Sequence, residues 1–136
     1  MDEFLIRSAA GSGGLLFYNR SPREPEKPIS GFWVRVTDLH LSGALNVYAG
    51  YMPSHPAGLF ADMARHWTGW KGELGWSSLE DELNLRCSHD RLGHIVIRVL
   101  LHSEYPSWQL EASVTTEAGQ LQALASQAKR FFGRES

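Results

Sequence analysis

Apolar and polar residues alternate in three separate runs, at 83–87, 95–101 and 108–114. An alternation of period two places every second side chain on the same face of an extended chain, which is typical of a half-buried β-strand. Turn-forming residues at 89–93 separate the first run from the second, and Pro106 separates the second from the third. The pattern therefore predicts a three-stranded antiparallel meander, because connections this short join neighbouring strands.

The apolar faces of these strands also suggest how they pair. Aligning them predicts that Leu85 lies opposite Ile97. The same alignment places Arg98 opposite Glu111, as a cross-strand ion pair on the outer face.

Four shorter extended segments are predicted in the first 51 residues, at 4–8, 15–18, 32–36 and 45–51. Between the second and the third lies a segment, 20–30, with proline at every third position among charged residues. Proline removes a backbone donor and favours extended conformations, so we expect this Pro-rich loop to be exposed and flexible.

Two helices are predicted from apolar residues that recur every third or fourth position. The first covers 59–67, with Trp67 as its last core side chain, and Gly69 follows its end. The second covers 121–132 and begins after Thr115 or Thr116, either of which could cap it.

Together these elements predict an α+β fold. We expect an antiparallel meandering sheet of about six or seven strands with two helices, the C-terminal helix packing on one sheet face. The 136 residues suit a single domain spanning 1–136.

Composition narrows the range of functions. Thirteen basic and fifteen acidic residues give a net charge of −2, which argues against binding to nucleic acid. The run at 95–101 is too short to span a membrane, and the N-terminal residues do not resemble a signal peptide. With a lone Cys87 that has no internal partner for a disulfide, we expect a cytoplasmic protein.

The reactive residue types form no recognised catalytic or metal-binding motif. The six histidines include no HxH or HExxH pattern, so we expect no metal and no cofactor. Cys87 points inward on its predicted strand, where a free cysteine behaves as a small apolar side chain. Only Glu80, His94 and Arg98 could be assembled into a catalytic group, and they give the weakest hypothesis, a hydrolase-like enzyme.

Tryptophan and glycine crowd the segment GWKGELGW at 69–76. Trp70 and Trp76 either close the core at the sheet edge, which we favour, or form a platform for a ligand. His94 directly follows Gly93, so its ring could fix the hairpin by donating to a turn carbonyl, or it could titrate as a switch. Trp33 lies on the face opposite Val34 and is expected to be more exposed.

The densest acidic run is Glu80, Asp81 and Glu82. Glu80 and Glu82 could share a strand face and act as acid and base, or Ser77 to Glu80 could form a helical capping box. A solvated strand entry is the simpler interpretation. The run is also the best candidate for a contact surface, because exposed acid beside aromatic residues suits a basic partner.

Residues 60–133 resemble a family of small bacterial proteins of unknown function, which is loosely similar in style to immunity proteins that neutralise a toxin. The matching positions are Gly69, Trp70, Gly72, Trp76, Ser78, Glu80, Gly93, His94 and Trp108.

Three functional hypotheses follow from these observations. The first is a non-catalytic protein-binding domain, of which an immunity-type inhibitor of a bacterial protein toxin is one form. The second is a small-ligand-binding α+β domain that uses Trp70, Trp76 and His94. The third is the hydrolase-like enzyme. A long edge strand near Phe4 or Trp108 could also pair with another copy, so the oligomeric state is open.

Overall fold

The computed structural model describes residues 3–9, 11–50 and 54–133. In chain order its elements are β1 (Glu3–Arg7), β2 (Gly14–Ser21), β3 (Gly31–Thr37), β4 (Ser42–Tyr48), α1 (Ala57–Arg65), β5 (Glu73–Ser77), β6 (Leu83–His89), β7 (His94–Ser103), β8 (Trp108–Glu117), a one-turn 3₁₀ helix (Ala118–Gln120) and α2 (Leu121–Phe132).

The strands form two four-stranded antiparallel sheets rather than the single sheet of six or seven strands that the sequence predicted. Sheet A has the order β1-β2-β3-β4 and sheet B the order β5-β6-β7-β8. The prediction missed β5, because glycine and tryptophan interrupt the alternation there. It also assumed pairing across residues 49–72, where α1 leads the chain away from β4 before sheet B begins.

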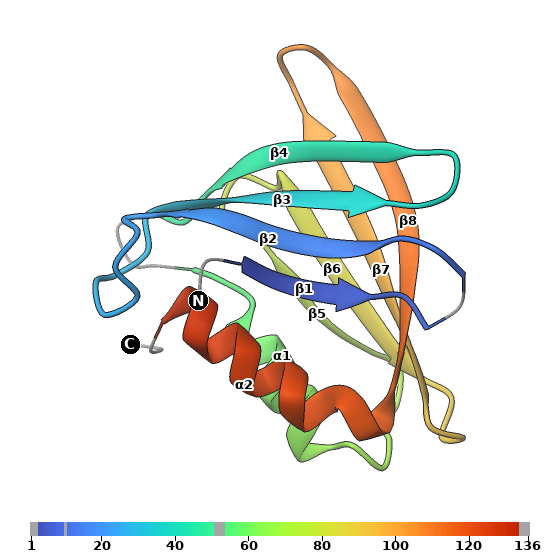
Figure 1. The fold of residues 1–136 in the computed structure, drawn as a ribbon. Coiled ribbons are helices and arrows are strands. Elements are labelled where there is room, and N and C mark those ends of the chain that lie inside the picture. Colours follow the sequence, from blue (N-terminus) through green and yellow to red (C-terminus); the bar gives the residue numbers. More distant parts are fainter. Residues whose placement is uncertain (1–2, 10, 51–53, 134–136) are drawn as a thin grey trace.

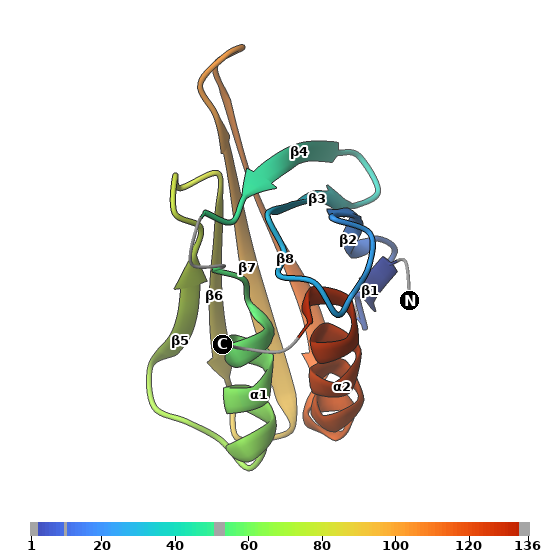
Figure 2. The same ribbon diagram turned by 90° about the vertical axis from the view of Figure 1, so that its left-hand side faces the viewer.

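The two sheets cross at a steep angle, and both helices fill the space that they leave open. Figure 1 shows β1 to β4 running across the direction of β7 and β8, with α1 and α2 side by side below. In the turned view, α1 lies next to sheet B and α2 next to β1 (Figure 2). One apolar core therefore receives side chains from both sheets and both helices.

The predicted C-terminal helix is present, and it packs Phe132 into the core. The aromatic rings around Phe132 lie with their centroids 4.9–6.3 Å away, mostly edge to face, and belong to Phe131, Phe32, Phe17, His55 and Phe4. Edge-to-face packing is favourable beyond the area that it buries. The last turn of α2 is thereby fixed to the inner face of sheet A.

Arg20, at the entry to the Pro-rich loop, is buried and holds the C-terminal end of α2. Its guanidinium donates to the carbonyl oxygens of Phe131 at 2.8 Å and Phe132 at 3.1 Å. Those carbonyls have no partner inside the helix, and a cation is favourable at this end of the helix dipole. The same guanidinium donates to three loop carbonyls, those of Pro22, Glu24 and Lys27. The flexibility of this loop stays a prediction.

Two predicted helix boundaries are wrong. Helix α1 ends at Arg65, and Trp67 is 55% exposed instead of buried. The chain leaves helical geometry at His66, whose N–H donates to the carbonyls of Asp62 and Met63, so Trp67 falls out of the apolar stripe. Nor does Thr115 or Thr116 cap α2, because β8 continues to Glu117 and the 3₁₀ turn follows it.

The predicted meander is present, but its register differs by two residues. Leu85 pairs with Val99, and Arg98 lies opposite Ser113 rather than Glu111. Alternation determines only which face a side chain occupies, so a shift of two residues leaves the pattern satisfied. The carboxylate that pairs with Arg98 is Glu73 on β5, at 3.3 Å.

Replacing Phe132 by alanine should lower the free energy of unfolding by about 3–5 kcal/mol, because the cavity would open within an aromatic cluster. Urea denaturation measures this loss. The control is Leu92→Ala in the β6–β7 turn, where the side chain is 81% exposed and truncation should change stability little. Equal effects of the two substitutions would contradict the packing described for α2.

Candidate functional site

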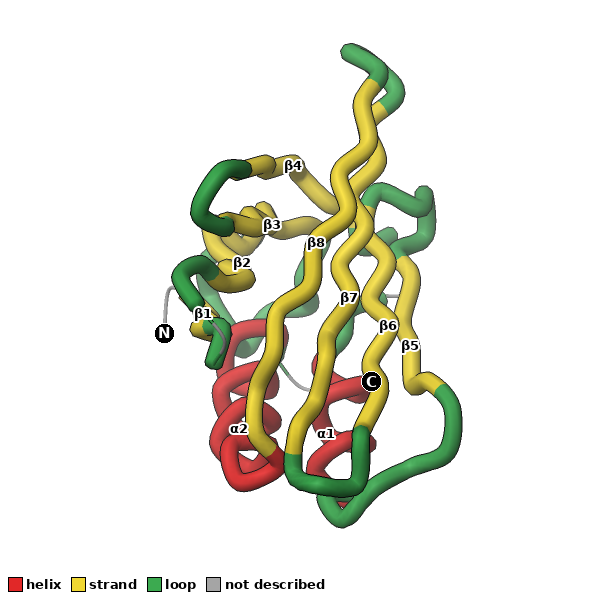
Figure 3. Tube along the Cα trace, turned by 90° about the vertical axis from the view of Figure 1, so that its right-hand side faces the viewer, coloured by secondary structure: helices red, strands yellow, loops and turns green. Residues whose placement is uncertain are grey.

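The hairpin of β7 and β8 projects beyond the rest of the molecule. Both strands have ten residues, whereas β6 pairs with β7 only as far as Leu101. Figure 3 shows the end of the hairpin extending beyond β4, β5 and β6. Tyr105 lies in the turn at its tip and is 92% exposed. A large aromatic side chain is thus presented to solvent in the turn that ends a regular β-hairpin.

A hollow of about 540 Å³ lies at the base of this hairpin, and we call it the acidic hollow. It is bounded by β4, by the turn between β5 and β6, and by the hairpin itself. Three carboxylates, Glu80, Glu82 and Glu104, line it together with His102 and Tyr105; the remaining lining residues are Leu45, Asn46 and Ser103.

Ser78 organises the turn that carries these acids. Its hydroxyl is buried, donates to Glu82 Oε1 at 2.7 Å and accepts the N–H of Leu83 at 3.0 Å. The other oxygen of Glu82 accepts the N–H of Tyr48 at 2.9 Å, which ties the turn to β4. The two predictions for this segment, a helical capping box and a shared strand face for Glu80 and Glu82, are both wrong, because 78–82 is a β-hairpin turn.

The carboxylates around the base of the hairpin have no ion-pair partner among the described residues. The ion pairs found there join other residues, and none involves Glu80, Asp81, Glu104 or Glu111. On the other side of the hairpin base, Asp81 and Glu111 line a second hollow of about 550 Å³. Among the described residues that line the two hollows, His102 is the one basic residue. Negative charge therefore surrounds the base of the hairpin.

Trp70 and Trp76 use their polar groups within the protein. Trp70 is 9% exposed, its indole N–H donates to the carbonyl of Cys87 at 3.0 Å, and its ring contacts His89 edge to face. Trp76 is half-buried on β5 and donates to Ser54 Oγ at 3.2 Å. Neither side chain lines the hollows at the hairpin base. Both positions match the core-closing role that the sequence favoured.

His94 is exposed at the start of β7. Its ring contacts a carboxylate, whereas the sequence analysis offered a bond to a turn carbonyl. Its Nδ1 lies 2.6 Å from Asp90 Oδ2, and Asp90 Oδ1 accepts the N–H groups of Leu92 and His94. The hydrogen bond and charge of Asp90 raise the pKa of His94, and Glu117 adds to this more weakly. The backbone N–H of His94 and the other donors lower the pKa of Asp90 to about 2.

The fold does not bring Glu80, His94 and Arg98 together. The turn of Glu80 and Glu82 lies at the His102 end of β7, where the His102 N–H donates to the Glu82 carbonyl. His94 lies at the opposite end, eight residues or roughly 26 Å away.

Cys87 is buried between strands, and burial raises its pKa to about 12. Among residues 3–9, 11–50 and 54–133, no cluster of three or more His, Cys, Asp or Glu could hold a metal ion.

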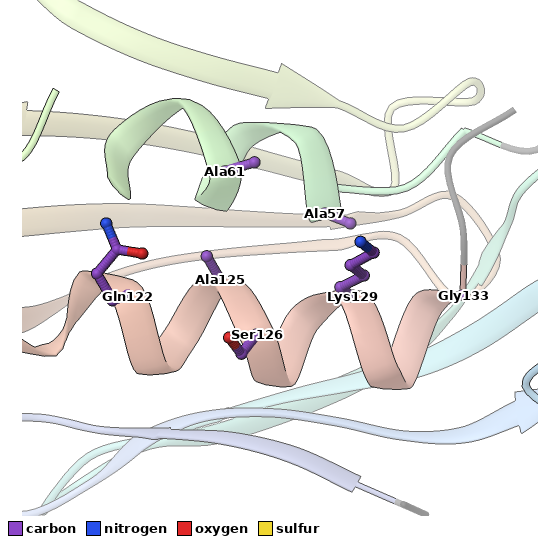
Figure 4. A pocket seen from close by; sticks show the side chains of 7 residues that line it. All are labelled: Ala57, Ala61, Gln122, Ala125, Ser126, Lys129 and Gly133. Atoms are coloured by element: carbon purple, nitrogen blue, oxygen red, sulfur yellow. The ribbon is translucent and has the colours of Figure 1, made fainter. Parts of the chain in front are cut away.

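A third hollow, of about 470 Å³, lies between α1 and α2 (Figure 4). Small side chains line it on both helices, Ala57 and Ala61 on α1 and Ala125 and Ser126 on α2, and Lys129 stands near one end. Gln122 spans the other end and donates to the Ala64 carbonyl. Small residues here allow the two helices to lie close together, which is the structural role that this composition supports.

The sequence interpretation missed two exposed groups of residues. One is the tip of the hairpin, Glu104 and Tyr105, which the turn signal at Pro106 could have pointed to. The other is on the outer face of sheet A, where the guanidinium of Arg35 lies 5.0 Å above the Tyr18 ring and Trp33 lies beside it. Trp33 is 37% exposed, as its position opposite Val34 suggested.

Comparison with known protein families finds one family model that matches nearly the whole sequence. The model of a family of unknown function, DUF6228, matches residues 6–135. The chain belongs to this family. The resemblance noted for residues 60–133 thus extends to nearly the full chain, including sheet A. No curated protein and no solved structure matches it significantly. In the described part of this DUF6228 chain, no helix is both long and apolar enough to cross a membrane.

In this DUF6228 protein, His94 should titrate above its ordinary pKa of 6.5. The stabilisation from a raised histidine pKa is complete below 6.5 and is lost as pH rises through the folded value. The stabilisation that ionised Asp90 contributes is fully present above about pH 3.8 and is lost as the pH falls through about 2.

An NMR titration of the His94 ring should show a lower midpoint in Asp90→Asn, which keeps the side-chain oxygen that accepts the turn N–H groups. Glu117→Gln should lower it less, and an unchanged midpoint in Asp90→Asn would contradict the pairing.

Cys87 of the DUF6228 chain should react slowly with a thiol reagent at neutral pH, because the reactive thiolate is nearly absent and the side chain is buried. The reaction in urea supplies the reference for a free thiol, and we expect the native rate to be at least about tenfold lower. Rapid native labelling would show that Cys87 is accessible and reactive.

Proposed function

We propose that this chain is a non-catalytic protein-binding domain that recognises a basic surface of a protein partner through the acidic hollow. One observation carries the proposal: Glu80 and Glu104 line a hollow without an ion pair among the described residues, and the exposed Tyr105 stands on its rim. Unpaired acid attracts a basic partner over a distance and orients its approach.

The chemistry of the rim suits a protein more than a small molecule. Tyrosine is among the residues that most often dominate the energy of protein interfaces, and its rigid ring loses little freedom on binding. Tyr105 lies in the turn at the end of the hairpin, and this end extends away from the body of the molecule (Figure 3), where an approaching surface meets it first. Carboxylates then contribute specificity around this contact, because like-charged partners are rejected.

The form of partner that we favour is a bacterial protein toxin, with this chain as an immunity-type inhibitor. A toxin that acts on nucleic acid needs a basic surface to neutralise phosphates. An acidic hollow complements such a surface and could cover it. The small-ligand alternative has less support, because Trp70 and Trp76 already donate to Cys87 and Ser54.

The decisive measurement is direct binding between this chain and the purified protein encoded by the neighbouring gene, by calorimetry at low and at high salt. The double variant Glu80→Lys/Glu104→Lys should bind about tenfold more weakly or worse, because repulsion replaces attraction. The affinity of the original chain should fall as salt rises, and that of the variant should depend less on salt.

The matched control is Glu3→Lys/Glu117→Lys, which changes net charge equally at exposed positions outside both hollows at the hairpin base. It should bind nearly as well as the original chain. If the control and the hollow variant lose affinity equally, net charge alone explains the binding and the proposed site is wrong.

A further inference from the structure

Strand β8 is the outer strand of sheet B, and the first part of it lacks the usual protection of an edge. It has ten residues, about twice the average strand length, and its pairing with β7 runs from Trp108 to Glu117 without a bulge. The strand contains no proline and no lysine, which commonly block edge pairing. Figure 3 shows it along the outer side of the sheet.

The hydrogen bonds of Thr115 show which backbone groups face outward. Its N–H donates to Ser8 Oγ at 3.3 Å and its carbonyl accepts the N–H of Ala9 at 2.8 Å, so both groups point away from β7. Backbone groups in an antiparallel strand alternate between the two sides. The N–H and C=O groups of Gln109, Glu111 and Ser113 therefore point the same way as those of Thr115.

Beyond Thr115 this edge is open among the described residues. No backbone partner is found there for the outward groups of Gln109, Glu111 and Ser113. Every side chain from Trp108 to Ser113 is half-buried or exposed. The first part of β8 therefore offers three donors and three acceptors in a regular row.

The charge on β8 favours a foreign segment over a second copy of this chain. Two copies that paired antiparallel about Glu111 would place the two Glu111 side chains directly opposite each other, which is destabilising. A lysine or arginine in that position would instead form a cross-strand ion pair. Glu111 also lines the second hollow beside Asp81 and His102, so the negative surface at the hairpin base continues onto this edge.

We infer that β8 accepts an extended segment of the partner as a fifth strand of sheet B, with a basic side chain opposite Glu111. This inference rests on the proposed function, since the segment belongs to the same basic partner. Main-chain hydrogen bonds to Gln109, Glu111 and Ser113 supply the affinity, and alternate side chains supply the choice of sequence. On the inner face, apolar side chains of the segment extend the half-buried surface of Leu110 and Ala112.

Hydrogen exchange followed by NMR tests the edge directly. In the chain alone, the amides of Glu111 and Ser113 should exchange quickly, and those of Leu110 and Ala112, which face β7, should exchange slowly. The probe is a synthetic peptide of alternating valine and lysine with blocked ends; at saturation it should slow Glu111 and Ser113 by about tenfold or more. The same peptide with glutamate in place of lysine should not. Slow exchange of Glu111 and Ser113 in the chain alone, or no slowing with the lysine peptide, would overturn the inference.

Two variants separate backbone pairing from charge. Ser113→Pro removes an outward N–H that the β7–β8 ladder does not use, so it should leave the melting temperature nearly unchanged and abolish the effect of the lysine peptide. Ser113→Ala is its control and should behave like the original chain. Glu111→Lys keeps the backbone donors and should prefer the glutamate peptide. Equal binding of the lysine peptide by Ser113→Pro and Ser113→Ala would rule out strand addition.

The same variants distinguish this inference from the proposed function when they are tested with the neighbouring gene product. If Ser113→Pro binds it fully while Glu80→Lys/Glu104→Lys does not, the acidic hollow is the binding site and strand addition is wrong. If both variants lose binding, both proposals hold. If neither does, both fail.

Discussion

The packing of Phe132 against the inner face of sheet A is the contact on which the rest of the structure depends. Two twisted sheets that cross steeply leave an open side, and each would expose apolar side chains there. Helix α2 closes that side, and Phe132 joins it to phenylalanines of β1, β2 and β3. Arg20 completes this closure by donating hydrogen bonds to the carbonyl oxygens at the end of the helix. Sheet A and α2 thus stabilise one another.

Local patterning was sufficient to predict most elements but not their assembly. The alternation around Ile97 and the apolar stripe that ends at Phe132 place a strand and a helix correctly, because each pattern lies within one element. The division into two sheets depends on the chain path after Tyr48, which no local period encodes. Likewise the register of Leu85 depends on turn geometry, since a shift of two residues satisfies the same alternation.

The candidate site was predictable only in part, for a related reason. The charges of Glu80 to Glu82 are visible in the sequence, and their exposure follows from charge. The residues that lie beside them in space cannot be identified from the sequence. Glu104, Tyr105 and His102 come from a different hairpin, which lines the acidic hollow because β7 extends beyond its pairing with β6. Trp70 drew attention as an aromatic residue in a glycine-rich segment, yet its hydrogen bond to Cys87 shows a residue that completes the interior.

Because β6 is shorter than the β7–β8 hairpin, one part of the hairpin lies in the core and the other part lies outside it. Residues near Ile97 stabilise the interior, and residues near Tyr105 are largely exposed to solvent. Substitutions at the tip therefore cost the fold little, so a lineage can change the residues there without first acquiring spare stability. In the proposed binding role, a scaffold of this kind can follow a changing partner while its interior stays the same.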